Sequence, residues 1–589
     1  MGGFHRFLKT TVKALEQLNV EVNNHVQQHQ QQQQQQSSSH YGHVPTTVPN
    51  SSYPGNVAQQ QQQHYDNAPY SRIVYPGPDG KLIYPPYNDQ GDRILDFSSA
   101  GYHEGWNDLP ENVPVVMSLD PSGQDDSVRI QQALNHLGSQ PLLQGSSFRG
   151  ALQLNRGHYY ISQPLEFRVS GVVLQGDPTG GTIIVGTSDP LTTKCLFKIV
   201  GEANEYTKRV PIISEHVPVG GNTITVRDKN HFKIGDSIMV GVAFNETWIK
   251  AVGMDVIHPK GNKDKNNGWK PGRFEHLRRV AAIQPDGKTL ILNEPLTASL
   301  SKQYGGGFVT KYENKRVQHV GLQFFECQFP ENKDRGPDEM MKSQKKPVKD
   351  YRFADEMFNH LMVAMDSAEN CWIRRVRSVW WRNFARLGTN TVAVTLQECH
   401  HTFPNPPGHV DKRKPIPLTG QFAFELSGQM ILIDRCHAEY NFHAYSYKGR
   451  IPGPNVVYQS SCIAKNGDVG PHMKWSTGQL YDKIKCVCEL CIDCNIEGLM
   501  IIQDRFDAGS GHGWSGANSV VWNTVAHAGM VVQNPPTAHN FLMGSSSKRG
   551  KARIPHHEWA CEESPDKKIN PPSLYMTQLN ERRQRLQQQ

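Results

Sequence analysis

Beyond residue 308 the chain repeats one pattern: a short run of alternating apolar residues, then a Cys, Val or aromatic residue, then a turn. The pattern recurs in RVQHVGLQFFEC, NCWIRRVRSVWW, TNTVAVTLQECH, GQMILIDRCHAEY, PNVVYQSSCIAKNGD and ANSVVWNTVAHAG. Cys436, Cys462 and Cys488 follow one another at intervals of 26 residues. A period in the twenties, built from short strands without helices, predicts stacked coils whose equivalent positions form ladders about 4.8 Å apart.

The segment that starts at Val113 has the features of the first coils. The strand-like run VPVVMSL precedes the Asp125-Asp126 pair, which predicts the start of a capped helix. Short strands ended by Gly or Asn follow in GALQLNRGHYYI, PLEFRVSGVVLQG and GGTIIVG. The apolar side of the helix is predicted to comprise Val128, Ile130, Ala133, Leu134 and Leu137. We therefore expect an all-β solenoid with an N-terminal capping helix.

Residues 201–300 have a sequence pattern that differs from the repeat. The run VAAIQPDGKTLILNEPL is typical of a hairpin that turns at Pro285-Asp286-Gly287. A polar segment rich in Lys, Asn and Gly, residues 259–273, is expected either to border a cleft or to be a solvated loop. These features predict a small β subdomain inserted in the main fold.

The two ends of the chain are expected to differ from the solenoid. Residues 1–70 form a Gln-rich tail that lacks the apolar residues needed to offset ordering entropy, so we expect disorder there, with a short amphipathic helix within Met1–Val26. Residues 71–112 predict an extended arm, residues 113–560 the solenoid, and residues 561–589 a polar tail. Met1–Val26 has no unbroken apolar core, so we expect no secretory signal peptide, and hence an intracellular location or unconventional secretion.

The charge pattern excludes some classes of partner. The net charge is +7 and the pI about 8.7, which fits an anionic substrate. No dense block of Lys and Arg is present, so a nucleic-acid partner is not expected. No run approaches the roughly 18 consecutive apolar residues that a membrane span requires.

Two segments resemble a known superfamily. The run DPSGQDDSVRIQQAL resembles the N-terminal cap of right-handed parallel β-helix proteins of the pectate-lyase superfamily, and GVVLQGDPTGGTIIV is similar to their first coil. Between Tyr440 and Asn523, GDVGPHMKWSTGQLYD and IIQDRFDAGSGHGWSGAN resemble an uncharacterised, lyase-like subgroup. The resemblance covers residues 113–545 and implies a right-handed parallel β-helix. The superfamily contains lyases, hydrolases, epimerases and non-catalytic spikes, so it leaves the activity open.

A comparison with one family of the superfamily tests whether the chain has the motif of a hydrolase. Polygalacturonases carry Gly-His-Gly after an Asp-Asp pair, and Gly511-His512-Gly513 is present here. The preceding coils, however, offer only the single carboxylates Asp493 and Asp504. The chain therefore lacks the Asp-Asp pair of polygalacturonases. This argues against a glycoside hydrolase, because glycoside hydrolysis requires two carboxyl groups.

The spacing of the ionisable residues predicts one groove. Arg450 and Lys474 are 24 residues apart, as are Tyr481 and Arg505, which equals one coil. A set within three coils spans on the order of 10 Å, because each coil adds about 4.8 Å. The residues expected to face this groove are His443, Arg450, His472, Lys474, Tyr481, Arg505 and His512.

The residues expected to face the groove could cleave a uronate polymer by β-elimination, and each would then have a distinct role. The reaction needs a cation that neutralises the carboxylate, a base for the C5 proton and an acid for the departing oxygen. We predict His472 as the base, with His512 as the alternative, Arg505 as the carboxylate clamp and Tyr481 as the acid. Lys474 is predicted to add positive charge beside Arg505. The expected substrate-binding residues are His443, Arg450 and, by stacking on sugar rings, Trp475, Trp514 and Trp522.

A cysteine cluster raises the question of a metal. Cys486, Cys488, Cys491 and Cys494 have a spacing that allows a zinc site. Cys488, however, continues the ladder of Cys436 and Cys462, which favours packing as small apolar residues. Asp504 and Asp507 are too few ligands for Ca²⁺. We therefore expect neither a metal nor another cofactor.

These observations predict a carbohydrate-active enzyme, a lyase acting on an acidic polysaccharide or oligosaccharide. A glycoside hydrolase or epimerase on the same scaffold is the alternative among enzymes. A non-catalytic β-helix that binds glycans or proteins is the alternative of another class. The sequence leaves the identity of the sugar and the oligomeric state open.

Overall fold

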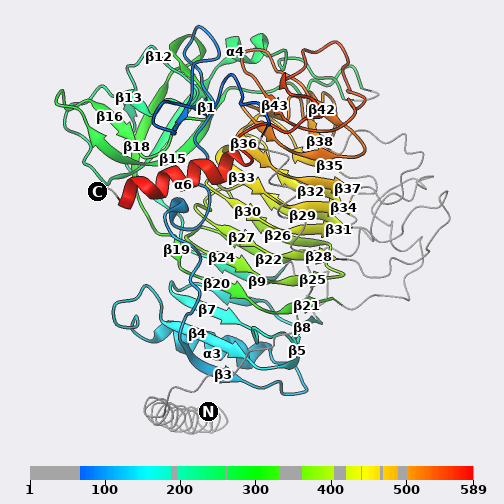
Figure 1. Cartoon of the computed structure of the whole chain (residues 1–589). Coiled ribbons are helices and arrows are strands. Elements are labelled where there is room, and N and C mark those ends of the chain that lie inside the picture. Colours follow the sequence, from blue (N-terminus) through cyan, green and yellow to red (C-terminus); the bar gives the residue numbers. More distant parts are fainter. Residues whose placement is uncertain are drawn as a thin grey trace, which may run out of the picture.

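Three long parallel sheets run along the molecule, and each coil in the middle of the solenoid contributes one strand to each sheet (Figure 1). The computed structural model describes residues 67–187, 195–259, 262–329, 361–402, 420–439, 441–463, 468–487 and 500–587. The predicted Gln-rich tail lies outside the described residues up to residue 66. The body is a right-handed parallel β-helix, as predicted.

Sheet 1 has thirteen strands, in which β39 pairs only with β36. Its strands are β3 (Val115–Leu119), β4 (Gly150–Leu154), β7 (Val172–Gln175), β20 (Gly321–Gln323), β24 (Trp372–Arg374), β27 (Thr395–Gln397), β30 (Leu432–Asp434), β33 (Pro452–Tyr458), β36 (Ser476–Asp482), β39 (Gly516–Ala517), β40 (Val520–Trp522), β43 (Phe541–Met543) and β44 (Cys561–Glu563).

Sheets 2 and 3 have nine strands each. Sheet 2 contains β5 (Gly157–Ile161), β8 (Thr182–Gly186), β21 (Glu326–Gln328), β25 (Arg377–Val379), β28 (His400–Thr402), β31 (His437–Glu439), β34 (Ser461–Ile463), β37 (Lys485–Val487) and β41 (Val525–Ala526). Sheet 3 contains β6 (Leu165–Phe167), β9 (Cys195–Val200), β22 (Leu361–Asp366), β26 (Asn383–Leu387), β29 (Gly420–Leu426), β32 (Asn441–Tyr447), β35 (Asp468–Pro471), β38 (Met500–Ile502) and β42 (Met530–Val532).

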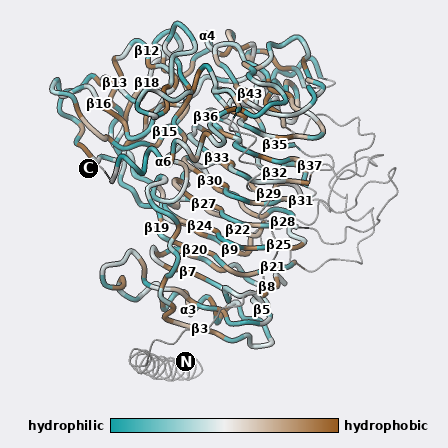
Figure 2. The backbone as a smooth tube through the Cα atoms, in the orientation of Figure 1, coloured by the Kyte–Doolittle hydropathy of each residue, from teal (hydrophilic) through white to brown (hydrophobic). Residues whose placement is uncertain are grey.

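Columns of apolar side chains fill the space between the sheets. In sheet 1, Leu322, Ile373, Leu396, Ile433 and Val457 stand in register on successive coils, and all are fully buried. Figure 2 shows hydrophobic residues recurring along the stacked strands. The alternation read from the sequence therefore marks the inward positions, because neighbouring residues of a strand point to opposite faces.

The cysteine ladder has a different register from the predicted one. Cys462 pairs with Cys486 on the next coil and with Ala438 on the previous coil, so Cys436 does not belong to this column. Cys488, Cys491 and Cys494 lie outside the described residues, as does Asp493. The neighbouring Cys486 thiol and burial raise the pKa of Cys462 well above its usual value, as expected for a thiol that packs in a core.

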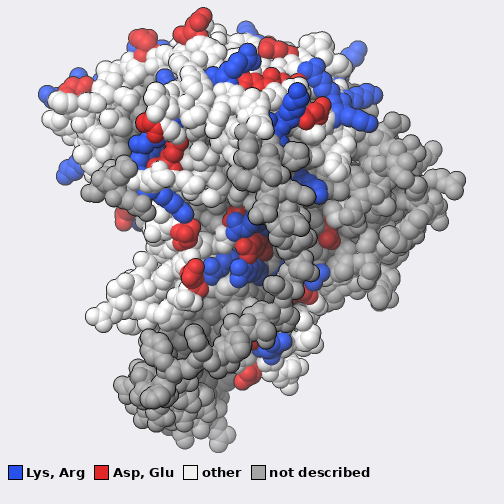
Figure 3. Space-filling view, in the orientation of Figure 1, with Lys and Arg blue, Asp and Glu red and all other residues white. Residues whose placement is uncertain are grey.

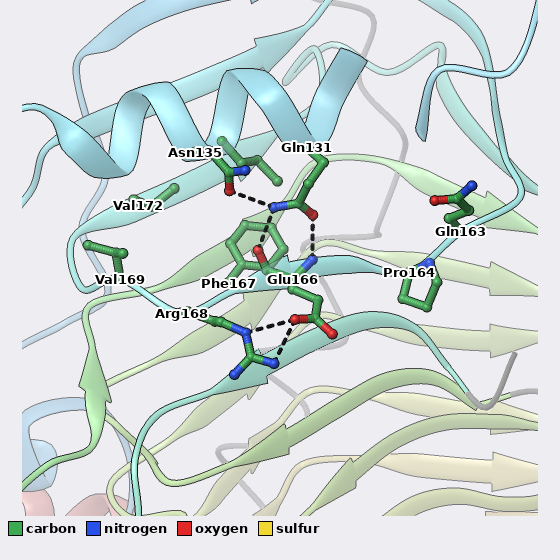
Figure 4. Close-up of a pocket in the computed structure, with 10 residues that line it drawn as sticks. Gln131, Asn135, Gln163, Pro164, Glu166, Phe167, Arg168, Val169 and Val172 are labelled. Atoms are coloured by element: carbon green, nitrogen blue, oxygen red, sulfur yellow. Dashed lines mark hydrogen bonds and ion pairs between the residues drawn. The ribbon is translucent and has the colours of Figure 1, made fainter. Parts of the chain in front are cut away.

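The capping helix α3 (Ser127–Ser139) closes the first coil as predicted, with one difference. Ile130, Ala133, Leu134 and Leu137 are buried, whereas Val128 is 57% exposed and faces away from the core. Beside the helix lies a cavity of about 430 Å³, shown in Figure 4. There Gln131 accepts a hydrogen bond from Glu166 N at 2.7 Å and donates one to Glu166 O at 3.0 Å, which joins the helix to β6.

The inserted subdomain is an antiparallel sheet that reaches beyond the predicted limit of residue 300 (Figure 1). The predicted hairpin is present, since Ile283 pairs with Leu290 across the Pro285-Asp286-Gly287 turn. The strands of this sheet are β10 (Glu205–Tyr206), β11 (Val210–Pro211), β13 (Thr223–Thr225), β14 (Ser237–Phe244), β15 (Gly272–Ile283), β16 (Thr289–Leu292) and β18 (Gly307–Glu313). The short helices α4 (Glu246–Ala251) and η2 (Lys302–Tyr304), and the pair β12 (His216–Val217) and β17 (Leu300–Ser301), complete it.

The remaining short elements belong to the arm and to one turn of the solenoid. The arm contains β1 (Tyr75–Pro76), β2 (Leu82–Ile83) and the 3-10 helix η1 (Tyr102–Gly105). In the solenoid, β19 (Val317–Gln318) pairs with β23 (Ala368–Glu369). No helix in the described parts of the chain is long and apolar enough to cross a membrane.

The segment expected as a polar tail, 561–589, contains a helix that packs on the solenoid. The helix α6 (Leu574–Gln587) crosses sheet 1 beside the arm (Figure 1). Leu574 and Tyr575 are buried against it, and the Gln578 side chain accepts a hydrogen bond from Phe97 N at 2.9 Å. Three buried apolar residues of this mostly polar segment, Leu574, Tyr575 and Leu579, pack in one cluster with Phe97 of the arm.

A buried ion pair joins this helix to the subdomain. Arg582 Nη2 lies 2.7 Å from Glu294 Oε1, and the two side chains are 7% and 1% exposed. The Arg582 guanidinium also stacks 4.1 Å above the ring of Trp106 in the arm. Burial raises the pKa of Glu294 to about 7 in spite of the arginine, so this carboxyl depends on its partner to remain charged.

We expect Arg582→Met to lower the free energy of unfolding by about 3–5 kcal/mol, because it leaves Glu294 buried without its partner. Urea denaturation followed by far-UV circular dichroism measures the change. Arg585→Met on the same helix is the control, since its contact with Asp96 is solvent-exposed and 3.7 Å long. Equal effects of the two substitutions would contradict the role given to the buried pair.

Candidate functional site

Three histidines from consecutive coils lie with their rings close together. His443 is in β32, His472 directly follows β35, and His512 is in the loop between β38 and β39. The ring centroids of His443 and His472 are 4.5 Å apart, and those of His472 and His512 are 4.7 Å apart. The stacking of sheet 3 causes this, because His472 N bonds to Tyr447 O of the coil below at 2.8 Å.

Asp468 and Arg505 complete this group, which we call the histidine cluster: His443, Asp468, His472, Arg505 and His512. Asp468 stands in register with His443, and its carboxylate contacts His443 Nδ1. Arg505 Nη2 lies 3.7 Å from Asp468 Oδ2, and Arg505 Nη1 donates to His472 O at 3.1 Å. The sequence analysis missed Asp468, although its position 25 residues after His443 was the available signal.

Hydrogen bonds determine which nitrogens of the cluster carry protons. Arg505 Nη1 lies 3.3 Å from His472 Nδ1, so that nitrogen accepts and the ring proton is on Nε2. His443 Nδ1 faces the Asp468 carboxylate and therefore carries its proton there. His472 thus presents an N–H donor, which suits it to donate a hydrogen bond rather than to act as the base predicted from the sequence.

The surroundings keep His472 and His512 neutral. Burial, His443 and Arg505 lower the pKa of His472 to about 2. Burial, Arg505 and Lys474 lower the pKa of His512 to about 4. Burial by itself would raise the pKa of Asp468, but the charges of His443 and Arg505 outweigh it and hold that pKa below its usual value. At neutral pH the cluster therefore contains a carboxylate, an arginine and the uncharged imidazoles of His472 and His512.

Two lysines add positive charge beside the cluster. Lys474 lowers the pKa of His512 and forms no ion pair with any residue that the structure describes. Lys448 Nζ lies 2.5 Å from Glu425 Oε1 and 5.0 Å from the ring centroid of Phe422, which stacks on His443. Lys474 is therefore the cation available to a ligand on this side.

Tyr481 does not join the cluster. It pairs with Val521 in sheet 1, points into the core and is fully buried. Burial raises its pKa well above the usual value, which does not fit the predicted role of general acid. The 24-residue spacing to Arg505 was misleading because this coil is longer: the hydrogen bond from Ile484 N to Thr524 Oγ1 joins residues 40 apart.

Arg450 and the three tryptophans lie at packing junctions instead of in a groove. Arg450 is one coil from Lys474, as predicted, since Arg450 N bonds to Lys474 O at 2.7 Å, but its guanidinium lies 5.1 Å above the ring of Phe244 in the subdomain. Trp475, Trp514 and Trp522 are all at most 3% exposed, so they are not platforms for sugar rings.

Each tryptophan has a specific partner that explains its position. Trp475 packs edge-on against Trp248 of α4, with ring centroids 4.8 Å apart. Trp514 Nε1 donates to Val252 O of the subdomain at 3.2 Å. Trp522 Nε1 donates to Pro571 O, which precedes α6, at 2.9 Å. These side chains therefore attach the subdomain and the C-terminal segment to the last coils.

A metal centre is not apparent in the described parts of the chain. There, no group of three or more His, Cys, Asp and Glu side chains has an arrangement that could hold a metal ion. The cysteine cluster, apart from Cys486, lies outside those parts.

Comparisons with known proteins identify similar folds. No protein-family model matches the chain, and no curated protein matches its sequence. The tailspike protein gp49 from Pseudomonas phage LKA1 is 12% identical with a TM-score of 0.42, over 72% of this chain and 56% of the tailspike. The chain thus spans little more than half the length of that protein.

Two enzymes are also similar. Endo-xylogalacturonan hydrolase from Aspergillus tubingensis is 8% identical with a TM-score of 0.32, over 77% of this chain and 92% of the hydrolase. The family GH82 iota-carrageenase from A. fortis is 8% identical with a TM-score of 0.29, over 75% of this chain and 57% of the carrageenase. At sequence identities of 8–12%, the similarity of these three proteins to the chain concerns the fold alone.

We expect Arg505→Gln to raise the pKa of both His472 and His512 by on the order of one unit, because it removes a positive charge beside neutral imidazoles. Titration of the histidine ring signals by NMR, with selectively labelled protein, measures the shift. Arg553→Gln is the matched control, since Arg553 pairs with Asp507 and is not among the groups that lower either pKa. Unchanged titration in Arg505→Gln would contradict the electrostatic description of the cluster.

Proposed function

We propose that the protein is a carbohydrate-active enzyme of the pectate-lyase superfamily that cleaves a uronate-containing polysaccharide by β-elimination. One observation carries the proposal: the histidine cluster brings a guanidinium, two neutral imidazoles with low pKa and a nearby lysine together on adjacent coils. These are the group types that the reaction needs.

The proposed reaction assigns one step to each group. Arg505 and Lys474 bind the uronate carboxylate, which makes the proton on C5 more acidic. His512 removes that proton, the C4–O4 bond breaks, and a C4–C5 double bond forms. His472 Nε2–H donates a hydrogen bond to the departing O4, which takes a proton from solvent, and Asp468 holds His443 and Arg505 in place beside it. His512 then releases the C5 proton to solvent. His512, the alternative base of the sequence analysis, thus replaces His472 in this role.

The electrostatics favour an anionic substrate. Arg505 and Lys474 contribute to lowering the pKa of His512, so a carboxylate bound between them raises that pKa toward the range of an effective base. A neutral sugar has no such effect. The surface nearby agrees, since Figure 3 shows Lys and Arg gathered over the last coils. In that part of the chain Lys548, Arg549, Lys551 and Arg553 are exposed.

Hydrolysis has less support. Inverting and retaining glycosidases use two carboxyl groups about 5–9.5 Å apart. Within the histidine cluster the one carboxylate is Asp468, which is buried and contacts both His443 and Arg505. An epimerase remains an alternative, because it starts from the same removal of the C5 proton. A glycan-binding protein without activity is the other alternative.

A panel assay tests the proposal. The full chain is incubated with alginate, pectate and glucuronan, with a neutral glucan as control, while the ultraviolet absorbance of the C4–C5 double bond and the number of reducing ends are followed. We expect the absorbance to rise on a uronate polymer only. Reducing ends without absorbance indicate a hydrolase, and binding without either signal indicates a glycan-binding protein; both results contradict the lyase.

On the active substrate, we expect His512→Gln and Arg505→Gln to lower kcat/KM by about 10²–10⁴, the usual contribution of general acid–base groups. Initial rates from the absorbance assay measure this. His158→Gln is the control, because His158 is exposed on β5 in an early coil. A loss of less than about threefold for both cluster variants would contradict their assignment.

The pH dependence follows from His512 as the base. A base must be unprotonated, so kcat/KM is lost as the pH falls through about 4, the pKa of His512 in the free enzyme, and is level above it. Lys474→Gln removes one of the cations that lower this pKa, so we expect the acidic limb of the profile to move to higher pH. Lys551→Gln, an exposed lysine of the last coils, should leave the limb in place. An unmoved limb in Lys474→Gln would contradict His512 as the base.

A further inference from the structure

A second cavity lies where the arm, the subdomain and the last coils meet, and we call it the junction cavity. Its volume is about 500 Å³, within the range of small-molecule sites. The arm contributes Asn88 to Asp92, the subdomain contributes residues of β14, α4, β15 and η2, and the last coils contribute Pro535 to His539. None of the residues of the histidine cluster lines it.

Hydrogen bonds across the three segments give the junction cavity a fixed shape. Trp248 Nε1 of α4 donates to Thr537 Oγ1 of the last coils at 3.3 Å. Asp92 of the arm accepts a hydrogen bond from Val219 N of the subdomain at 2.8 Å and another from Asn88 Nδ2 at 2.9 Å. A ligand therefore meets walls that are already in place, which lowers the entropic cost of binding.

One wall of the junction cavity is aromatic. Phe244, Trp248 and Phe274 line it, and the three rings pack on one another with centroids 5.0–6.0 Å apart. Tyr304 of η2 also lines the cavity. Phe244, Trp248 and Phe274 are at most 6% exposed and make this wall apolar, whereas the half-buried Tyr304 is the ring that can meet the C–H face of a sugar.

Two histidines of the lining have a ring nitrogen that lacks a partner. His216 Nε2 and His539 Nδ1 are buried and have no hydrogen-bond partner among the described residues. Buried polar atoms in native proteins are generally paired with protein, water or ligand. Ser299, Ser301 and Gln303 add further hydrogen-bonding groups to the same lining.

The charge of the junction cavity differs from that of the histidine cluster. Its lining contains the carboxylates Asp92 and Glu558 but neither Lys nor Arg. Glu558 Oε1 accepts a hydrogen bond from Asn534 Nδ2 at 3.0 Å. Carboxylates without a compensating cation repel an anionic ligand, so a uronate is disfavoured here, while hydroxyl groups can bond to carboxylate and imidazole alike.

We propose that the junction cavity is a second carbohydrate site, which binds an uncharged sugar residue. Tyr304 receives one face of the ring, and hydroxyl groups bond to His216, His539 and the serines. This goes beyond the proposed function, because the site binds a neutral sugar whether or not the histidine cluster cleaves a polymer.

Ligand-detected NMR on the full chain tests this. The probes are glucose, galactose, mannose, xylose, N-acetylglucosamine and cellobiose, with glucuronate and galacturonate as charged counterparts. We expect saturation transfer to at least one neutral sugar, a change in tryptophan fluorescence on titrating it, and at least tenfold weaker binding of the matched uronate. Absence of binding by every neutral sugar overturns the proposal, as does equal binding of the uronate.

Variants locate the binding. His216→Phe with His539→Phe keeps the rings but removes their nitrogens, and should weaken the sugar Kd at least tenfold. His231→Phe is the control, since His231 is in the subdomain but does not line the cavity. If the double variant does not fold, as judged by circular dichroism, Gln303→Ala, which changes a residue of the short η2, replaces it with the same expectation. An unchanged Kd in the folded variant overturns the proposal.

A final comparison separates this proposal from the lyase. His512→Gln should bind the neutral sugar with unchanged Kd, because His512 does not line the junction cavity. A parallel loss of sugar binding in His512→Gln would place the neutral sugar at the histidine cluster and overturn the second site. Failure of the lyase assay with retained sugar binding would instead overturn the proposed activity alone.

Discussion

Hydrogen bonding between successive coils is the constraint on which the other features of this protein depend. Parallel strands about 4.8 Å apart place equivalent residues of consecutive coils next to one another, whatever their separation in sequence. Inside the solenoid this produces apolar columns such as Leu322, Ile373 and Leu396. Outside it, the same constraint brings His443 and Asp468 into contact from neighbouring coils.

The fold was predictable because the solenoid repeats one physical rule many times. The inward positions alternate along every strand, so the pattern survives coils of different length. Arrangements that depend on coil length were less predictable. Tyr481 and Arg505 are one average period apart, but the coil that begins at β36 carries the extra loop with His512, so Tyr481 meets Val521 instead. His472 and His512 met as expected because both are anchored directly to sheet strands or to the backbone beside them.

Contacts between distant segments could not be read from the sequence. Trp475 beside the polar run GPHMK has the composition of a sugar subsite, yet its partner is Trp248, which lies in an insertion more than two hundred residues earlier. A single sequence gives no means to distinguish an aromatic residue that binds sugar from one that packs against an inserted subdomain. The same limit applies to the terminal helix, where mostly polar residues concealed the few side chains, such as Leu574, that are buried against sheet 1.

The position of α6 has a consequence for how the protein is made. The helix follows every coil in the sequence, yet it covers sheet 1 together with the arm and pairs through Arg582 with Glu294, all of which are synthesised much earlier. Domains begin to fold while the chain is still being translated. The coils can stack as they emerge, but part of the apolar outer face of sheet 1 stays exposed until α6 itself has emerged from the ribosome. The newly made solenoid therefore passes through a stage in which it is vulnerable to aggregation, and docking of α6 ends that stage.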